Sequence, residues 1–288
     1  MTPLFWTELL TRALRDDRVD HDWTSRAIES PKVKRAKAKI VAKEDGVWAC
    51  AGLVAAANQI LGFEFLLKSS AIDGASFKKG AKLVSLEGNA QDLLGLERSF
   101  LNIAAYACGI ATQTHRLVEI VNKRKSLRSK PRIVSTRKIL PGFHELAIHA
   151  VEAGGGFCHR ADLSGGILIK ENHIRTAGSI SQAVKLCRKK APHLLKIEIE
   201  VESFKQIDEA LEAQADVIML DNFKPDQIKR AAGLIKAKDP RCLIEVSGGI
   251  NEKNLSKYLI DGVDVISVGS LTHSVRSLDL SMQFEAKL

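Results

Sequence analysis

The chain has 288 residues, of which 45% are hydrophobic and 27% charged, and its formal net charge is +9. This length suits one large barrel or two domains, and this composition argues against long disordered stretches. The positive charge indicates a solvated basic surface or an attraction for anions such as phosphate esters, carboxylates and nucleic acid. Because only 5% of the residues are aromatic, a stacking platform for single-stranded nucleic acid is disfavoured, and we expect no nucleic-acid partner.

The cysteines and the N-terminus indicate a cytoplasmic protein. The five cysteines are Cys50, Cys108, Cys158, Cys187 and Cys242. None of them lie two to four residues apart, so no zinc motif is present, and an odd, scattered set is typical of reduced thiols. Residues 1–10 lack the basic start and apolar core of a signal peptide. No segment approaches the roughly 20 apolar residues of a membrane span, so we expect no membrane partner.

The N-terminal part of the chain predicts a mixture of helices and strands. Leu9, Leu10, Ala13 and Leu14 have helical spacing. Short apolar runs separated by turn residues then predict strands at Lys39–Ala42, Gly46–Leu53, Phe63–Leu67 and Ala81–Leu86. A helix is expected around Val54–Leu61 and a longer one over Ala90–Ile120. Within the longer helix, Gly109 indicates either a break or close packing.

After Lys130 the pattern becomes an alternation of strands and helices. Six apolar segments end in polar residues: Arg132–Lys138, Gly166–Lys170, Leu195–Glu202, Asp216–Asp221, Leu243–Ser247 and Asp264–Gly269. Helices are expected between most of them, at Ser179–Lys190, Phe204–Glu212, Pro225–Lys236 and Asn251–Ile260. This alternation predicts parallel βαβ units. We favour an α/β barrel over an open sheet because polar residues end so many successive strands.

The strand ends carry the residues expected to do chemistry. In chain order they are Arg137 and Lys138, Lys170, Glu200, Asp221, Ser247-Gly248-Gly249 and Gly269-Ser270. Arginine and lysine at such positions bind carboxylates or phosphates, and His159-Arg160 adds two further candidates. Carboxylate oxygens from separate strands suit Mg²⁺, directly or through water, so Glu200 and Asp221 are the metal candidates. The two glycine-rich turns predict a phosphate cradle on the last two strands.

Some of these residues have ordinary alternative interpretations. His159, taken alone, is more typical of a hydrogen-bonded structural histidine, and His173 and His273 invite the same interpretation. Glu198, Glu200 and Glu202 alternate, so all three point to one side of their strand. A barrel interior would not easily bury three carboxylates, so the sequence leaves open whether Glu198 or Glu202 joins Glu200.

Several longer motifs resemble the quinolinate phosphoribosyltransferase family. In the C-terminal part they are Thr136-Arg137-Lys138, Pro141-Gly142, Gly154-Gly155-Gly156, His159-Arg160, Leu168–Ile174, Glu198–Glu202, Met219–Phe223, Glu245–Ile250, Ile266–Gly269 and Leu271–Val275. In the N-terminal part they are Glu97-Arg98, Asn102 and Gly109–Thr112. The run Ile169-Lys170-Glu171-Asn172-His173 is the most specific of them, and the resemblance covers about residues 40–280.

The resemblance implies an incomplete α/β barrel preceded by an α/β sandwich-like domain. The expected bounds are 1–112 for the first domain and 113–271 for the barrel, with the tail 272–288 returning to the first domain. It implies a homodimer or larger homo-oligomer in which Arg98 reaches the site of the neighbouring subunit. The implied reaction converts quinolinate and phosphoribosyl pyrophosphate, with Mg²⁺, to nicotinate mononucleotide, pyrophosphate and CO₂ during NAD synthesis.

The same resemblance assigns a role to each candidate residue. The catalytic residues would be Lys138, Lys170, Glu200 and Asp221. The substrate-binding residues would be Arg98, Arg137, His159, Arg160, Lys170, Ser247, Gly248, Gly249, Gly269, Ser270 and His273. In this assignment the arginines, His159 and Lys170 bind the two carboxylates of quinolinate, while Lys138 and the glycine-rich turns hold phosphates.

Three positions depart from the family pattern. Ile139 replaces a threonine, His144 replaces an arginine, and Cys158 replaces an asparagine. One alternative is therefore a related enzyme associated with molybdate transport that takes another substrate, although the segment Leu168–Ile174 argues against it. A second alternative is a basic nucleic-acid-binding protein, whose cations would lie on the outer surface and whose binding would weaken steeply with salt.

Overall fold

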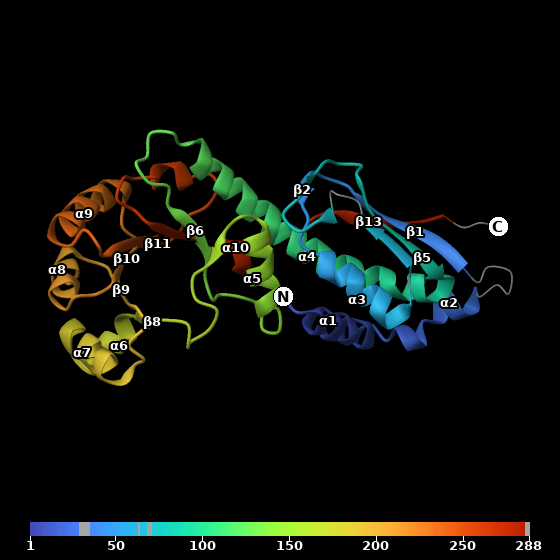
Figure 1. Cartoon of the computed structure of the whole chain (residues 1–288), viewed down its shortest axis with the longest axis horizontal. Helices are drawn as coiled ribbons and strands as arrows, with labels where there is room; N and C mark the ends of the chain where they lie inside the picture. The colour runs from blue at the N-terminus through green and yellow to red at the C-terminus, as the bar shows by residue number, and fades with distance from the viewer. Residues whose placement is uncertain (29–34, 63, 68–70, 286–288) are drawn as a thin grey trace. The chain divides into compact units, whose positions relative to one another are not determined.

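The computed structural model of the chain describes residues 1–28, 35–62, 64–67 and 71–285. The chain divides into two compact units (Figure 1), and each is described separately below. The first unit comprises Met1–His115, Glu145–Gly155 and Val275–Leu288, and the second comprises Arg116–His144 and Gly156–Ser274. The predicted domain boundary at residues 112/113 falls inside one helix, α4 (Ala90–Lys123), and stays a prediction.

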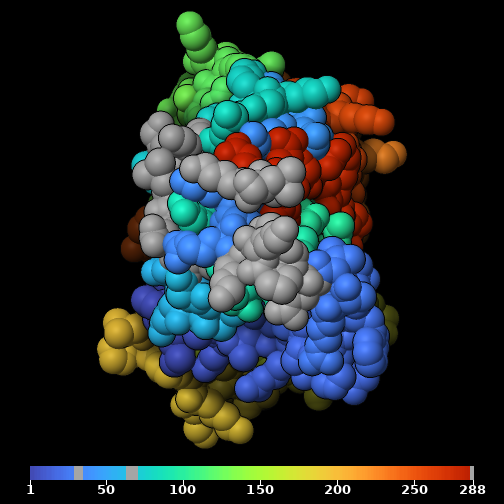
Figure 2. Space-filling model, turned by 90° about the vertical axis from the view of Figure 1, so that its right-hand side faces the viewer, coloured from blue at the N-terminus to red at the C-terminus, as the bar shows by residue number. Residues whose placement is uncertain are grey.

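The first unit contains a four-stranded antiparallel sheet. Its strands are β1 (Arg35–Ala42), β3 (Glu64–Leu67), β5 (Lys82–Asn89) and β13 (Leu280–Glu285), in the order β13-β1-β5-β3. β13 pairs with β1, so that the last described residues lie against an early strand, as Figure 2 shows in red beside blue. A short pair, β2 (Gly46–Val47) and β4 (Ser76–Phe77), completes the strands. Phe63, at the start of the predicted strand Phe63–Leu67, lies outside the described residues.

The helices of this unit begin with α1 (Pro3–Asp16), η1 (Val19–His21), α2 (Trp23–Ala27) and α3 (Ala51–Leu61). Trp6 of α1 is buried and occupies the space over Gly52 of α3, where an added Cβ would lie 2.7 Å from the indole Cε2. The predicted strand Gly46–Leu53 is wrong beyond Val47, because α3 already begins at Ala51. The distant Asp73 accepts a hydrogen bond from the Ala51 N–H at 2.9 Å, and so satisfies one of the N–H groups that the first turn leaves without an intrahelical partner.

α4 runs without interruption through Gly109, so of the two interpretations of this glycine only close packing holds. A Cβ at Gly109 would lie 3.2 Å from Cα of Ser277 and would meet the backbone carbonyl of Arg276. The neighbouring Ala105 carbonyl accepts a hydrogen bond from the Leu278 N–H at 2.9 Å. The C-terminal segment therefore packs directly on the α4 backbone. α5 (His144–Ala153) supplies the remaining helix of the first unit.

The second unit is a curled, fully parallel sheet of seven strands (Figure 1), which confirms the predicted incomplete barrel. The order is β7-β6-β12-β11-β10-β9-β8, so β7 and β8 form its two open edges. The strands are β6 (Arg132–Ser135), β7 (Phe157–Cys158), β8 (Ile167–Ile169), β9 (Ile197–Val201), β10 (Val217–Asp221), β11 (Leu243–Ser247) and β12 (Val265–Ser267). The sequence predicts six of these strands and misses β7, which has only two residues.

The helices of the second unit are α6 (Glu171–Ala177), α7 (Ile180–Lys190), α8 (Phe204–Glu212), α9 (Pro225–Lys238), η3 (Leu255–Lys257) and α10 (Ser270–His273). Hydroxyls of Ser179 and Ser203 cap α7 and α8. The predicted helix Asn251–Ile260 is wrong, since only the turn η3 forms there. The side-chain amides of Asn251 and Asn254 both donate to the Gly249 carbonyl, and this bonding competes with a regular helix.

Two further observations bear on the expectations from composition. All five cysteines lie in the described part of the chain, and none of them forms a disulfide. Among the helices of the described residues, none combines the length and the hydropathy needed to cross a membrane.

Candidate active site

The parallel strands of the second unit end around a cavity of about 410 Å³. Its lining residues are Thr136, Arg137, Lys138, His159, Arg160, Leu168, Lys170, Glu200, Met219, Asp221, Glu245, Ser247 and Ser267. Parallel pairing places Asp221 opposite Ser247 and Met219 opposite Glu200, so strand ends far apart in sequence meet at one level. Eight of the predicted site residues line this one cavity: Arg137, Lys138, His159, Arg160, Lys170, Glu200, Asp221 and Ser247.

Cations are crowded along part of this lining. Burial lowers the pKa of Arg160, and the neighbouring charge of Arg137 lowers it further. Nη1 of Arg160 donates a 2.9 Å hydrogen bond to the Gly166 carbonyl, which fixes the guanidinium. Crowded cations repel one another unless an anion joins them, so this arrangement favours a ligand with more than one negative charge.

Two carboxylates lie close together in the same cavity. Burial raises the pKa of Asp221, the charge of Glu200 raises it further, and the charges of Lys170 and Lys138 lower it. Nζ of Lys170 forms an ion pair with Glu200, and Nδ2 of Asn222 donates to Asp221 at 2.7 Å. A pair of hard oxygen donors with neighbouring lysines suits both a divalent cation and a developing positive charge.

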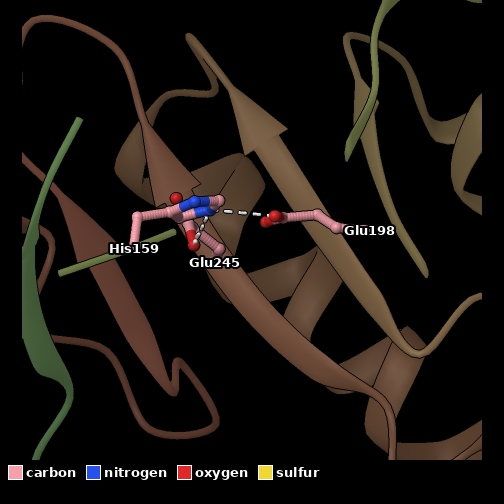
Figure 3. Close-up of side chains that lie close together, drawn as sticks. All are labelled: His159, Glu198 and Glu245. Atoms are coloured by element: carbon pink, nitrogen blue, oxygen red, sulfur yellow. Dashed lines mark ion pairs between the residues drawn. The ribbon is translucent and has the colours of Figure 1, made fainter. Parts of the chain in front are cut away.

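His159 lies between two other carboxylates (Figure 3). Its Nε2 atom is 2.8 Å from Oε2 of Glu198 and 3.2 Å from Oε2 of Glu245. Burial alone would lower the pKa of His159, but the hydrogen bonds and charges of Glu198 and Glu245 raise it to about 10. Burial raises the pKa of Glu198, and His159 counteracts that rise. The ligand atoms of the three residues lie within 4.8 Å of one another, which is also compatible with a metal ion.

The remaining glutamate of the β9 pattern does not reach the cavity. Glu202 follows the end of β9 and is exposed. Glu198 is instead buried, and its carboxylate takes part in the His159 cluster. Of the two residues that the sequence left open, the structure therefore brings Glu198 close to the cavity.

The glycine-rich turns lie beside the cavity, and Gly248, Gly249, Gly269, Ser270 and His273 are absent from its lining. Gly248 and Gly249 have φ values of 107° and 61°. At Gly269, an added Cβ would lie 3.1 Å from the ring of His273, whose Nδ1 contacts the Ser274 hydroxyl at 2.7 Å. The hydroxyl of Ser270 is buried and has no hydrogen-bond partner among the described residues. The phosphate-binding role of these residues stays a prediction.

Arg98 is an exposed residue of α4 and belongs to the first unit. It does not line the cavity of the second unit. Its predicted action on a neighbouring subunit therefore stays a prediction.

The sequence assigned no role to five of the lining residues: Thr136, Leu168, Met219, Glu245 and Ser267. A signal for four of them was available. Leu168, Met219, Glu245 and Ser267 each precede a recognised strand-end residue by two positions, and alternate residues of a strand face the same side.

None of the three departures from the family pattern lines the cavity. The N–H of Ile139 donates to the Arg137 carbonyl at 3.0 Å. Nε2 of His144 contacts the Ala161 carbonyl. Cys158 is half-buried in β7, next to His159. The substitutions thus change the surroundings of the cavity and leave its lining unaltered.

The geometry agrees with the similarity of the chain to known proteins. Residues 22–108 match the N-terminal domain of quinolinate phosphoribosyl transferase, and residues 110–283 match its C-terminal domain. The chain belongs to the quinolinate phosphoribosyltransferase family. This finding confirms the resemblance that the sequence motifs indicated.

Curated relatives in this family are similar over nearly their whole length. A probable nicotinate-nucleotide pyrophosphorylase [carboxylating] of Methanocaldococcus jannaschii is 38% identical over 281 residues, covering 96% of this chain and 95% of the relative. A protein of the same printed name from Bacillus subtilis is 39% identical, covering 98% and 94%. The solved structure of NadC from Streptococcus pyogenes superimposes with a TM-score of 0.89 at 34% identity, covering 99% of each chain.

Proposed function

We propose that this protein is a quinolinate phosphoribosyltransferase of de novo NAD synthesis. It converts quinolinate and phosphoribosyl pyrophosphate to nicotinate mononucleotide, pyrophosphate and CO₂. One observation carries the proposal: a single cavity brings together the cations of Arg137, His159, Arg160 and Lys170 and the carboxylate pair of Glu200 and Asp221. A dicarboxylate needs the first group, and a ribosyl centre that gains positive charge needs the second.

The cationic group orients the pyridine ring. Arg137 and Arg160 bind carboxylates through two N–H groups each, while His159 and Lys170 add point charges. With both carboxylates held, the ring nitrogen faces C1 of the ribose. Such positioning supplies roughly 7–11 kcal/mol in well-oriented model reactions. Lys138, Ser247 and the turns Gly248-Gly249 and Gly269-Ser270 hold the phosphates, and His273 lies beside the second turn.

The carboxylate pair acts on the ribose. The bond between C1 and the pyrophosphate oxygen breaks as the ring nitrogen bonds to C1, and Glu200 and Asp221 stabilise the positive charge on the ribose. The nitrogen then carries the positive charge. The carboxylate next to it leaves as CO₂, because the electron pair left on the ring carbon is stabilised beside that charge, and the carbon finally takes up a proton.

Glu200 and Asp221 are also the residues that fit Mg²⁺. Their oxygens are hard donors, and the charge of Glu200 adds to the effect of burial in raising the pKa of Asp221, so these two carboxylates would hold a divalent cation. When bound there, the ion would neutralise part of the negative charge on the departing pyrophosphate. We further propose that the protein acts in the cytoplasm as a homodimer or larger homo-oligomer, with Arg98 completing the site of a neighbouring subunit.

The direct test is an assay of the purified protein with Mg²⁺, quinolinate and phosphoribosyl pyrophosphate. We expect nicotinate mononucleotide as the product. Formation of a nucleotide from another pyridine or base, with none from quinolinate, would contradict the substrate assignment. It would favour the related enzyme of molybdate-transport operons.

A further inference from the structure

Two buried glutamates that no substrate role explains lie against His159. Glu198 comes from β9 and Glu245 from β11, and β10 runs between these strands. Their side chains are only 9% and 3% exposed, whereas that of His159 is 16% exposed. Figure 3 shows both carboxylates directed at the same nitrogen, Nε2 of His159. The imidazole is therefore the partner that the two strands share.

Two carboxylates buried this close together repel each other, and each also loses its hydration. The second oxygen of each, Oε1, is buried and has no hydrogen-bond partner among the described residues. The polar contact that the two carboxylates share is therefore Nε2 of His159, which lies 2.8 Å from Glu198 and 3.2 Å from Glu245. An imidazole that donates from Nε2 to two carboxylates stabilises them most strongly when it is positively charged.

The cluster also separates two cavities within the second unit. His159, Arg160 and Glu245 line the cavity of about 410 Å³ at the strand ends. The same three residues, with Glu198, also line another cavity of about 360 Å³, whose lining includes residues from strand beginnings such as Val217 and Val265. The imidazole thus has buried carboxylates on its Nε2 side and borders the space proposed for the substrate.

We propose that Glu245, together with Glu198, is a positioning residue that keeps His159 as an imidazolium cation, so that the carboxylates of the substrate meet a preformed positive charge. The inference rests on the proposed function only for the identity of that substrate. The two buried negative charges balance His159 and Arg160, and this balance lets adjacent cations coexist in the empty cavity. The buried carboxylates thus stabilise the positive charges of His159 and Arg160 before any substrate binds.

Other charged groups near His159 must be considered with it. Within the second unit, Glu198 and Glu245 contact it from β9 and β11, and Arg160 follows it in the chain. Arg137 interacts electrostatically with Arg160 and lines the same cavity, as do Lys170 and Glu200. The pKa of about 10 for His159 is the net result of burial and the two carboxylates.

The first test is the titration of His159 by NMR in the ligand-free protein. Glu245→Gln keeps the shape and a hydrogen-bond acceptor but removes one charge. In the parent, the ¹⁵N signals of His159, assigned by their loss in His159→Asn, should stay those of an imidazolium up to about pH 9. In Glu245→Gln they should titrate at a pH lower by about one unit or more. Equal titration in both proteins would overturn the proposal.

The matched control is Asp73→Asn in the first unit. Asp73 also pairs with a histidine, with Oδ2 lying 3.0 Å from Nε2 of His149. This variant likewise removes one charge from a histidine–carboxylate pair, but outside the cavity. It should leave the titration of His159 unchanged. A shift of His159 in Asp73→Asn as large as that in Glu245→Gln would show a global effect and would overturn the proposal.

The second test separates KM from kcat. From about pH 6.5 to about pH 9, KM for quinolinate should rise about twofold more in Glu245→Gln than in the parent if the pKa of His159 falls by about one unit, and about tenfold more if it falls by about two, with kcat changing less than about threefold. A decrease in kcat without a change in KM, or a change in KM that does not depend on pH, would contradict the role of Glu245 in keeping His159 positively charged. If the parent shows no turnover of quinolinate, the proposed function fails, while the NMR titration still tests the histidine.

A metal ion is the competing occupant of this cluster. If His159, Glu198 and Glu245 bound zinc, the dialysed protein would retain one equivalent, and the Nε2 signal would be that of a metal-bound, unprotonated nitrogen. That result would overturn the proposal. A metal-free protein in which both Nδ1 and Nε2 of His159 carry a proton supports it.

Discussion

At the scale of single residues, the His159 cluster links stability to pH. The folded-state pKa of about 10 lies above the usual value of 6.5, so the folded protein holds this proton more tightly than the unfolded chain does. The stability that this adds is fully present below about pH 6.5 and is lost as the pH rises through about 10. Parent and Glu245→Gln should therefore both begin to lose stability above about pH 6.5, but the loss in the variant should be smaller and should level off at a lower pH.

Urea unfolding across this pH range measures the effect. The comparison uses the shape of each profile, because the substitution also changes stability by a constant amount. Two parallel profiles would show that Glu245 does not control the proton on His159.

Gly248 provides a second residue-scale prediction. Its φ of 107° is unfavourable for a side chain, and an added Cβ would lie 2.9 Å from the Asn222 backbone nitrogen and would overlap the Asn222 side chain. Gly248→Ala should destabilise the protein by about 1–3 kcal/mol. Gly249 has φ 61° and open space around it, so Gly249→Ala should cost only about 1 kcal/mol. If urea unfolding shows the same decrease in the free energy of unfolding for both variants, the contact between a side chain at position 248 and Asn222 is unimportant.

Most of the residues that line the cavity can be predicted from the sequence, because each apolar strand segment is followed by a charged residue or a glycine. It does not predict what those residues do to one another. The sequence gives Glu198 and Glu245 no common role, since they lie 47 positions apart and on strands that are not neighbours. Only the curl of the sheet brings both carboxylates to His159.

At the scale of elements, α4 offers a comparison between two glycines of one helix. A Cβ at Gly109 would collide with the backbone of Arg276 and Ser277, whereas one at Gly95 would lie 3.4 Å from Cβ of Val19. Gly109→Ala should destabilise by about 1–3 kcal/mol through overpacking. Gly95→Ala should stabilise by up to about 1 kcal/mol through helix propensity. Thermal unfolding of the two variants measures these changes in stability. A change in the same direction for both variants would contradict the packing assigned to Gly109.

The elements that the sequence predicts well are those whose patterns are local. β11 and α8 have the bounds expected from their apolar runs, and Ser203 marks the start of α8. The failures depend on distant or competing groups. Asp73 determines where α3 begins, and the amides of Asn251 and Asn254 bind the Gly249 carbonyl in place of forming a helix.

At the scale of the whole molecule, the shared site can be tested by complementation. Arg98→Ala and Lys170→Ala should each be inactive, because each lacks one residue of every site. After the two variants are mixed, dissociated and reassembled, random pairing into dimers gives half hybrids with one intact site, and thus about one quarter of the parental activity. Differently tagged chains verify that hybrids form. Verified hybrids without activity would contradict a site completed by a neighbouring subunit.

The central claim is that this cavity joins quinolinate to a phosphoribosyl group and releases CO₂. Quinolinate labelled with ¹³C in the carboxylate next to the ring nitrogen tests it most directly. With Mg²⁺ and phosphoribosyl pyrophosphate, labelled CO₂, nicotinate mononucleotide and pyrophosphate should appear in equal amounts, and CO₂ should not form without phosphoribosyl pyrophosphate. A nucleotide product that keeps the label, or product from nicotinate with none from quinolinate, would contradict the account.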